Sequence, residues 1–391
     1  MGMMQMTREA VIVEALRTPL GKRDGKLSGV HPVDLLAEVL NETAARSNLD
    51  VELIDDVICG CVSQVGEQSL NVGRNAWLAA GLPEEVPATT IDRQCGSSQQ
   101  AAHFAAQGVI SGAYDIAIAC GVESMSRVPM GSSAQAPGFP FPDSLMSRYE
   151  GGLVPQGISA EIISERWNIS RADADGFGAR SHERALKATE AGAFKNEIHP
   201  IKVADELFET DEGMRTPNPE KMATLQTAFR ADGIVTAGNS SQITDGASAV
   251  LITTPERAER LGLRSRARFV SFALAGTDPI TMLTGPIPAT RKLLAKAELS
   301  IEDVDVVEIN EAFASVVLAW KKELGIDDAW FDEHVNVHGG AIALGHPLGA
   351  SGTRLMATGL NALEQRNGRY LLQTMCEGGG LANATLLERL S

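Results

Sequence analysis

The chain resembles itself across a long interval, and this internal similarity constrains its fold more than any other feature. Residues 54–58 (Ile-Asp-Asp-Val-Ile) parallel residues 304–308 (Val-Asp-Val-Val-Glu), and residues 114–121 parallel residues 370–377. The offset of about 250 residues is much longer than the unit of a solenoid repeat. The similarity therefore predicts two α/β halves of similar fold with another segment inserted between them.

The cysteines support this duplication. The interval from Cys95 to Cys120 equals the interval from Ser351 to Cys376. Small residues follow Cys95 and surround Ser351, so two helix starts are expected at matching places. A chance likeness between two α/β segments is a weaker explanation, because it does not account for matching cysteine positions. Cys120 itself lacks any catalytic motif and is expected in the core.

Apolar patterns predict the types of the elements. Apolar runs indicate strands at residues 10–14, 57–62 and 115–120. Residues 32–47 carry apolar side chains at helical spacing, and residues 96–111 form an alanine-rich helical stretch. Strands that alternate with helices favour a layered α/β architecture.

The duplication suggests a division of the chain. We expect an N-terminal half at residues 1–120, completed by about residues 242–270, and a C-terminal half at residues 271–391. Residues 121–241 form the predicted insertion, and their first part is rich in Met, Pro, Gly and Ser. Loops this long in a compact enzyme are usually functional or lid-like. An oligomerisation arm is the alternative, and one segment could serve both roles.

Composition excludes several classes of protein. A net charge of −16 over 391 residues opposes general affinity for nucleic acid or anionic membranes. The chain has no apolar run long enough for membrane insertion and no secretory signal pattern, so a cytoplasmic protein is expected. Five cysteines, an odd number, argue against a disulfide framework. Cys59 and Cys61 have the wrong spacing for a metal or redox pair and are expected at a buried strand end, and no metal site is predicted.

Two cysteines and a histidine lie among small residues that allow a ligand to approach the backbone. His346 lies in a Gly-His-Pro sequence, and Cys376 is followed by Glu377 and three glycines. Cys95 precedes a predicted helix, whose N-terminus is expected to lower the pKa of the thiol. His346 is a candidate base for this thiol. Together these are the parts of a thiol-based acyl-transfer site.

With these residues, the sequence resembles the thiolase family. The similarity covers essentially the whole chain, and the matching blocks occur in the order that the family shows. They lie around Cys95 and at residues 12–19, 120–126, 236–241, 245–247, 310–314, 339–347 and 376–380. The resemblance implies the thiolase fold, which has two duplicated βαβαβαββ halves in a layered αβαβα arrangement with an inserted loop domain.

The resemblance also implies a mechanism. Cys95 would be the nucleophile that takes an acyl group from a 3-ketoacyl-CoA, and His346 would activate it. Cys376 would protonate the departing acetyl-CoA enolate and then deprotonate the incoming coenzyme A. The reaction would be a ping-pong thiolytic cleavage through an acyl-Cys95 intermediate, the reaction of an acetyl-CoA C-acyltransferase.

Two oxyanion holes are implied by the same likeness. Asn310 would position a water that forms one hole with His346, and the N–H groups of Cys95 and Gly378 would form the other. Cleavage of a carbon–carbon bond creates charge on two carbonyl oxygens, so two holes suit the chemistry. Asn310 could also be a helix N-cap before Glu311, and the two roles are compatible.

Coenzyme A would be a co-substrate, with no permanently bound cofactor. By family position, Arg215 would bind its nucleotide end and Ser241 its pantetheine arm, with Phe229 packed nearby. A negatively charged chain needs such a local site for a ligand that carries phosphates. A homodimer or homotetramer is the expected assembly.

Some positions depart from the common family pattern. His338 stands where Asn or Ser is usual, and could titrate near the site or face solvent. Gln226 replaces a frequent cation on the expected coenzyme A surface. Residues 155–157 (Pro-Gln-Gly) replace the His-Met-Gly of short-chain biosynthetic thiolases. This change favours a degradative enzyme that takes longer or bulkier acyl chains, as in fatty acid β-oxidation. Residues 21–23, 66–69 and 76–83 resemble actinobacterial thiolases of steroid degradation, of the sterol side-chain type.

Three other functions stay open or are disfavoured. An acetyl-CoA C-acetyltransferase working in the condensing direction would use the same residues. A ketoacyl synthase-like enzyme would need His or Asn in place of Cys376. A non-catalytic acyl-CoA carrier would not need to keep Cys95, His346 and Cys376 together.

Overall fold

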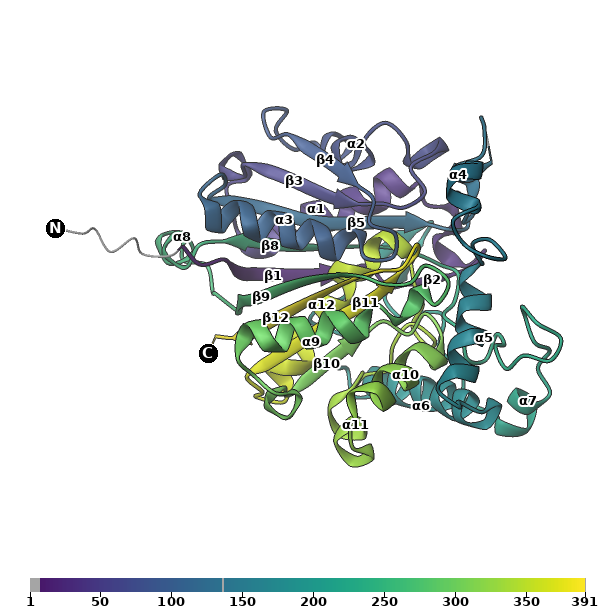
Figure 1. Cartoon of the computed structure of the whole chain (residues 1–391). Coiled ribbons are helices and arrows are strands. Elements are labelled where there is room, and N and C mark those ends of the chain that lie inside the picture. Colours follow the sequence, from purple (N-terminus) through teal and green to yellow (C-terminus); the bar gives the residue numbers. More distant parts are fainter. Residues whose placement is uncertain (1–7, 136, 391) are drawn as a thin grey trace.

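A large mixed β-sheet runs through the computed structural model, which describes residues 8–135 and 137–390 (Figure 1). The strands are β1 (Val11–Arg17), β2 (Gly21–Lys22), β3 (Asp56–Gly60), β4 (Ala88–Ile91), β5 (Ile116–Ser124), β6 (Ile201–Val203), β7 (Glu206–Phe208), β8 (Thr244–Thr253), β9 (Ala267–Gly276), β10 (Val306–Ile309), β11 (Tyr370–Glu377) and β12 (Leu381–Arg389). The order in the sheet is β10-β11-β12-β9-β1-β8-β5-β3-β4. In addition, β2 pairs with β8, while β6 and β7 form a separate hairpin.

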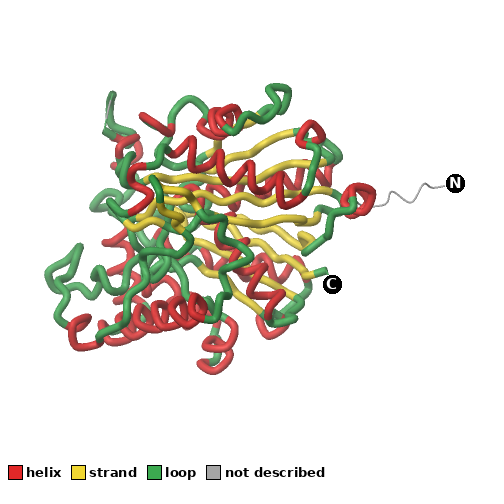
Figure 2. The backbone as a smooth tube through the Cα atoms, turned by 180° about the vertical axis from the view of Figure 1, so that it is seen from behind, coloured by secondary structure: helices red, strands yellow, loops and turns green. Residues whose placement is uncertain are grey.

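Helices cover and divide this sheet, as Figure 2 shows from behind. The helices are α1 (Pro32–Ser47), α2 (Val72–Ala79), α3 (Ser97–Ser111), α4 (Asp143–Met146), α5 (Gln156–Arg166), α6 (Arg171–Glu190), α7 (Pro219–Ala223), α8 (Pro255–Leu261), α9 (Pro286–Ala297), α10 (Ala314–Leu324), α11 (Asp328–His334) and α12 (Ser351–Gln365). The predicted elements are confirmed in type. The helix expected at residues 32–47 has these bounds in the structure, while the strand at residues 115–120 extends to Ser124.

Strand pairing confirms the duplication. In the first half β1 pairs antiparallel with β8, β8 antiparallel with β5, β5 parallel with β3, and β3 parallel with β4. In the second half β9, β12, β11 and β10 repeat the first three of these pairings in the same order. A parallel bridge from Val307 to Val335 takes the place of the pairing with β4. The halves join where Val11 and Ile12 of β1 pair with Arg268 and Ala267 of β9.

The middle layer consists of α3 and α12. Residues 351–363 of α12 are buried without interruption, and a helix that is buried on every side lies between two other layers. Alanines of α3 pack with α12 and with strands of both halves in one core cluster. On the outer faces, α1 and α2 cover the first half, and α9 and α10 cover the second. The layered αβαβα prediction is therefore confirmed.

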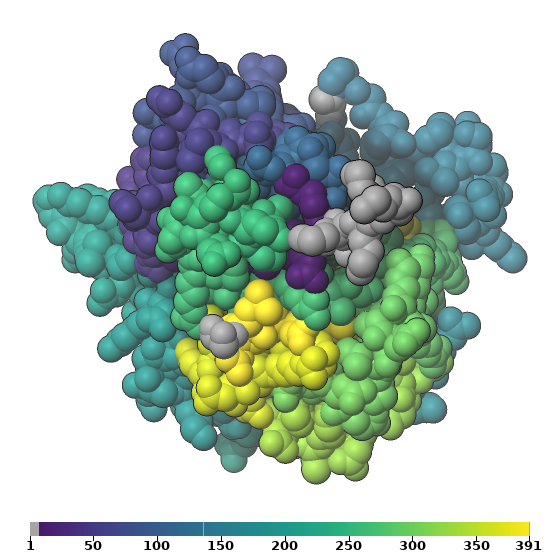
Figure 3. Space-filling model, turned by 90° about the vertical axis from the view of Figure 1, so that its left-hand side faces the viewer, coloured from purple at the N-terminus to yellow at the C-terminus, as the bar shows by residue number. Residues whose placement is uncertain are grey.

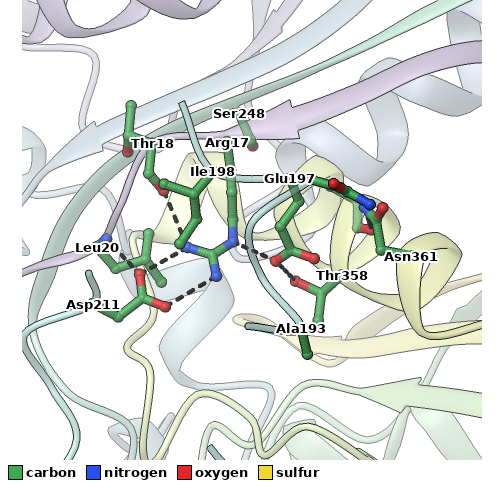
Figure 4. A network of polar contacts seen from close by, with 12 residues as sticks. Arg17, Thr18, Leu20, Ala193, Glu197, Ile198, Asp211, Ser248, Thr358 and Asn361 are labelled. Carbon is green, nitrogen blue, oxygen red and sulfur yellow. Dashed lines mark hydrogen bonds and ion pairs between the residues drawn. The ribbon is translucent and has the colours of Figure 1, made fainter. Parts of the chain in front are cut away.

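A buried ion network attaches the insertion to this framework (Figure 4). The Arg17 guanidinium at the end of β1 donates to Glu197 at 2.7 Å and to both carboxylate oxygens of Asp211, at 2.7 and 3.0 Å. Thr358 of α12 also donates to Glu197, at 2.7 Å. Buried charges need such partners, and removal of one would leave another unpaired. In Figure 3 the insertion appears as teal segments at the rim of the two halves.

Strand pairing also bears on the division of the chain. Because β8 pairs with β5, it belongs to the first half, while β9 pairs with β12 and belongs to the second. The expected limit between residues 270 and 271 falls within β9. We propose that the halves are divided in the connection between α8 and β9, with residues 121–241 as the insertion.

Two observations concern the described ranges 8–135 and 137–390 alone. None of the helices in these ranges is both long and apolar enough to cross a membrane. All five cysteines in them are free and buried, and Cys59, Cys61 and Cys120 lie in the core of the first half, as expected.

Candidate active site

Cys95 lies in a tight turn that leads from β4 into α3. Gln94 has a positive φ of 48°, and the Ser97 hydroxyl accepts from the N–H of Arg93 at 2.9 Å and donates to the carbonyl of Gln94 at 2.6 Å. Gly96 is required here, because a Cβ at this position would lie 2.0 Å from Oε1 of Glu377. The turn presents Cys95 just before the first turn of α3.

The Cys95 thiol is almost fully buried, with 4% of the residue exposed, and packs against Met125, Leu348 and Met375. Burial, followed by the nearby Glu377 carboxylate, raises the pKa of Cys95 to about 12, against hydrogen bonds from the Gln156 side chain and the Gly378 N–H. The expected lowering of this pKa by the α3 N-terminus is therefore wrong, because desolvation of a thiolate outweighs a helix terminus at such a site.

His346 is held as a neutral imidazole. Its Nδ1 lies 2.5 Å from the Ser351 hydroxyl, which in turn donates to the carbonyl of Pro347 at 2.8 Å. Because the hydroxyl proton goes to Pro347, Nδ1 must carry the proton and Nε2 has a free lone pair. Burial, followed by the charge of Arg354, lowers the pKa of His346 to about 3. The ring therefore offers an unprotonated nitrogen to the site.

Asn310 directly follows β10, and its Nδ2 lies 3.3 Å from Nε2 of His346. Its N–H donates to the carbonyl of Thr374 at 3.1 Å, which orients the residue from β11. Oδ1 has no hydrogen-bond partner among the described residues. Asn310 is not a helix N-cap, so that expectation is wrong: α10 starts at Ala314, with Phe313 as its N-cap.

The neighbouring Glu311 fixes the loop that carries His346. Its carboxylate accepts from Ser181 at 2.6 Å, from Asn336 at 2.9 Å and from the N–H of Ile342 at 3.1 Å. These contacts connect β10, α6 and the loop around residues 336–346. The loop therefore has little freedom to move His346 away from Asn310.

Cys376 brings the second half to the same place. It is fully buried near the end of β11, and burial raises its thiol pKa, with further contributions from Cys95 and Glu377. A charge effect between the two thiols requires that they lie close together. Gly379 and Gly380 adopt positive φ angles of 83° and 81°, and the chain turns there into β12.

Three residues at the site are not among the catalytic residues predicted from the sequence. Gln156, the first residue of α5, reaches Cys95, and its Nε2 would lie 3.1 Å from a Cβ on Gly378. Ser351 sets the proton position on His346, and Glu377 acts on both thiols. Glu377 gives a signal in the sequence, because it directly follows Cys376 and precedes the three glycines.

The candidates for coenzyme A binding lie in and beside the insertion. Arg215 is exposed, and its guanidinium lies 3.4 Å from Oε1 of Gln242, whose carbonyl accepts from the N–H of His346 at 3.3 Å. The N–H of Ser241 donates to the carbonyl of Ala312 at 3.0 Å. Phe229 is 44% exposed, with its ring 6.0 Å from that of Phe313. Arg215 and Ser241 therefore both lie next to Gln242, the residue that is hydrogen-bonded to the backbone of His346.

Two of the unusual positions lie elsewhere. His338 packs its ring against Phe194, with centroids 5.7 Å apart, and lines a cavity with Arg184 and Arg366 instead of facing the thiols. Burial lowers its pKa to about 4. Gln226 is exposed to solvent.

Comparisons with known proteins agree with this geometry. The model of the thiolase N-terminal domain matches residues 10–256, and that of the thiolase C-terminal domain matches residues 263–389. A steroid 3-ketoacyl-CoA thiolase, FadA6, of Mycobacterium tuberculosis is 49% identical over 98% of this chain and 94% of its own. A 3-ketoacyl-CoA thiolase of Bacillus subtilis is 42% identical over 97% and 99%. The crystal structure of the Bacillus anthracis acetyl-CoA acetyltransferase superposes with a TM-score of 0.89 at 37% identity, over 98% and 99% of the two chains.

Proposed function

The chain belongs to the thiolase family, and we propose that Cys95 is its acyl-accepting nucleophile, with His346, Asn310, Cys376 and Gly378 completing the catalytic site. Its activity is that of a degradative 3-ketoacyl-CoA thiolase, an acyltransferase. The observation that supports the assignment of the residues is the contact between the two cysteine segments, one from each half: a Cβ on Gly96, next to Cys95, would lie 2.0 Å from Oε1 of Glu377, next to Cys376, and Cys95 contributes to the raised pKa of Cys376.

In the first step Cys95 attacks the 3-keto carbon and its proton passes to Nε2 of His346. The resting thiol is neutral, since its pKa is about 12. Proton transfer must therefore accompany the attack, so that charge develops on the substrate oxygen and not on the sulfur. We assign the N–H groups of Cys95 and Gly378 to receive that oxygen, because preorganised donors of this kind are among the strongest catalytic devices.

The bond between C2 and C3 then breaks. Its electron pair forms the acetyl-CoA enolate, whose oxygen would meet His346 and a water held by Asn310. Cys376 gives its proton to the enolate carbon and becomes a thiolate. The buried surroundings that raise its pKa make this thiolate a strong base. It then takes the proton of the incoming coenzyme A thiol, which attacks the acyl-Cys95 thioester and releases the shortened acyl-CoA. Cys95 leaves as a thiolate and recovers its proton from His346.

Coenzyme A and 3-ketoacyl-CoA are the substrates of this reaction, and the family has no resident cofactor. We assign the nucleotide end of coenzyme A to Arg215, the pantetheine arm to Ser241 and a packing contact to Phe229. Arg215 contacts the side chain of Gln242, and the carbonyl of Gln242 accepts from the N–H of His346. These contacts support a bound coenzyme A that extends from its nucleotide end at Arg215 toward His346. A cytoplasmic homodimer or homotetramer completes the proposal, and Gln156 in place of a biosynthetic-type residue supports longer or bulkier acyl chains.

The assignment is tested by mixing the protein with a 3-ketoacyl-CoA and coenzyme A and recording the loss of enolate absorbance. Cys95→Ala should abolish turnover and the mass increase of the acyl-enzyme. Near-normal cleavage by Cys95→Ala would refute the role of this residue. A panel of acyl chains distinguishes the degradative enzyme from an acetoacetyl-CoA thiolase, which would cleave only the shortest substrate efficiently.

A further inference from the structure

A buried carboxyl group lies beside both thiols and has no role in the mechanism above. Glu377 is 0% exposed, and neither of its carboxylate oxygens has a hydrogen-bond partner among residues 8–135 and 137–390. The group contributes to the raised pKa of Cys95 and to that of Cys376. An ionised carboxylate without donors is costly to bury, so the carboxyl needs either a partner or a proton.

The surroundings of Glu377 come from three elements. The turn before α3 supplies Gly96 and Cys95, together with the charges of Arg93 and Asp92, while Cys376 precedes Glu377 on β11. From β12, Asn383 approaches the same point: a Cβ on Gly96 would lie 2.0 Å from Oε1 of Glu377 and 2.8 Å from Nδ2 of Asn383. Within the described ranges, Glu377 forms no ion pair at 4.0 Å or less.

The side chains of Glu377 and Asn383 have more hydrogen-bond acceptors than donors. Nδ2 of Asn383 donates to the carbonyl of Gly96 at 3.1 Å, while its Oδ1 has no partner in the described part of the chain. Two carboxylate oxygens and one amide oxygen are therefore acceptors without a donor. A proton on Glu377 supplies that donor, because a protonated carboxyl can donate to Oδ1 of Asn383.

We propose that Glu377 is a positioning residue that must hold its proton for turnover. Protonated, it completes a chain of hydrogen bonds through Asn383 to the carbonyl of Gly96 and so fixes the turn that presents Cys95. Ionised, it places a negative charge beside two thiols that must themselves carry negative charge during the reaction. This inference rests on the proposed roles of Cys95 and Cys376.

The direction of the pKa shift of Glu377 agrees with this geometry. Burial raises the pKa of Glu377 to about 8, while the charge of Arg93 and the nearby N–H of Asn383 oppose the shift and Asp92 adds to it. The carboxyl is then mainly protonated at neutral pH and loses its proton under mildly alkaline conditions. The thiolate fraction of Cys95 ordinarily increases with pH, whereas ionisation of Glu377 disfavours the thiolate. A pH profile can therefore distinguish the two effects.

The experiment compares the parent with Glu377→Gln, which keeps the shape and a hydrogen-bond donor but cannot ionise. The rate of Cys95 alkylation by iodoacetamide, measured by peptide mass spectrometry, and kcat/KM are both recorded from pH 6 to pH 10. At pH 7 the variant should be within about threefold of the parent. At pH 9, about one unit above the carboxyl pKa, it should exceed the parent about tenfold in both measurements.

Glu308→Gln is the matched control. Glu308 is another fully buried carboxyl whose pKa burial raises to about 8, but it does not act on either thiol. This variant should leave the pH dependence of alkylation unchanged. A ratio of Glu377→Gln to parent that is constant with pH, or the same pH effect in Glu308→Gln, overturns the proposal.

Glu377→Leu tests the positioning role separately, because it removes both the charge and the donor. Its kcat at pH 7 should fall about tenfold below that of Glu377→Gln; equal activity of the two variants refutes the hydrogen-bond chain. If either variant fails to fold, infrared spectroscopy of the parent decides, since an ionised carboxylate at pH 7 contradicts the proposal. Loss of activity in Cys95→Ala together with a flat pH ratio would refute this inference alone and leave the proposed function standing.

Discussion

Two buried carboxyls, Glu123 and Glu377, lie at the ends of corresponding strands and have opposite surroundings. Glu123 on β5 accepts hydrogen bonds from the N–H groups of Val62 at 2.9 Å, Ser63 at 3.0 Å and Gly349 at 2.8 Å, and from the Gln68 side chain at 2.9 Å. Glu377 on β11 has no partner among the described residues. Burial raises the pKa of both; four hydrogen-bond donors oppose the shift at Glu123, and the charge of Arg93 and one N–H, that of Asn383, oppose it at Glu377.

The difference shows how a duplicated fold separates stability from chemistry. The first half uses its carboxyl to fasten the loop after β3 to the start of α12. The second half leaves its carboxyl unpaired beside the thiols, where its proton can respond to pH. The same division applies to Cys120 and Cys376, which occupy matching strand positions: Cys120 packs in the core, and the pKa of Cys376 is raised in part by Cys95.

The largest effect should come from the two matched cysteines. Cys376→Ala removes the proposed acid and base, and kcat should fall roughly 10²- to 10⁴-fold. Cys120→Ala changes a residue of the same strand position in the other half, and kcat should stay within about threefold of the parent, with a loss of stability of about 1 kcal/mol from the cavity. Steady-state cleavage and denaturant unfolding check both variants, and equal losses of kcat would remove the distinction between the halves.

The next largest effect should be on the free energy of unfolding, which should differ between variants of Glu123 and Glu377. Each carboxylate oxygen of Glu123 accepts from two N–H donors, so Glu123→Gln places an amide N–H₂ against two of them and should lower the free energy of unfolding by about 2–4 kcal/mol at pH 7. Glu377→Gln should change it by less than about 1 kcal/mol, because no donor loses its partner there. Urea unfolding of the two variants measures the difference. A larger loss in Glu377→Gln than in Glu123→Gln would contradict the contrast drawn above.

A smaller effect is expected at the start of α12. Ser351→Ala removes the acceptor of the His346 Nδ1 proton, and kcat should fall about tenfold with little change in KM, since one buried hydrogen bond is worth about 1–1.5 kcal/mol. Ser248→Ala is the control, because Ser248 bonds to Ala350 at 2.7 Å without touching His346. An unchanged kcat in Ser351→Ala would show that the tautomer of His346 is set in another way.

The smallest effect concerns the pH dependence of stability. Burial raises the pKa of Glu308 from an ordinary value of 4.5 to about 8, with Arg354 opposing. The folded state therefore holds this proton more tightly than the unfolded state, and its stabilising contribution is full below about pH 4.5 and lost as pH rises through about 8. Relative to the parent, Glu308→Gln should become progressively more stable as the pH rises from 5 to 9. Thermal unfolding at several pH values tests this, and a constant difference would contradict it.

Much of the site could be predicted where local chemistry carries the signal. His346 between Gly345 and Pro347, and Cys376 before three glycines, are recognisable in the chain because such loops have few other uses. The helix at residues 32–47 was predictable at both ends, since His31 caps it and Asn48 adopts the left-handed conformation that ends it. The sequence alone also allows Asn310 as a helix cap, because a cap depends on where the helix begins, and only the structure shows that α10 begins at Ala314.

The sequence by itself determined the duplicated α/β plan, the types of the elements and the candidate catalytic residues, because apolar periodicity, glycine and reactive side chains act locally. Only the tertiary structure decided that Gln156 and Glu377 face the thiols, that Ser351 sets the proton on His346, and that Cys95 has a raised pKa. These properties depend on desolvation and on charges brought together from distant segments. Neither quantity exists until the two halves pack against each other.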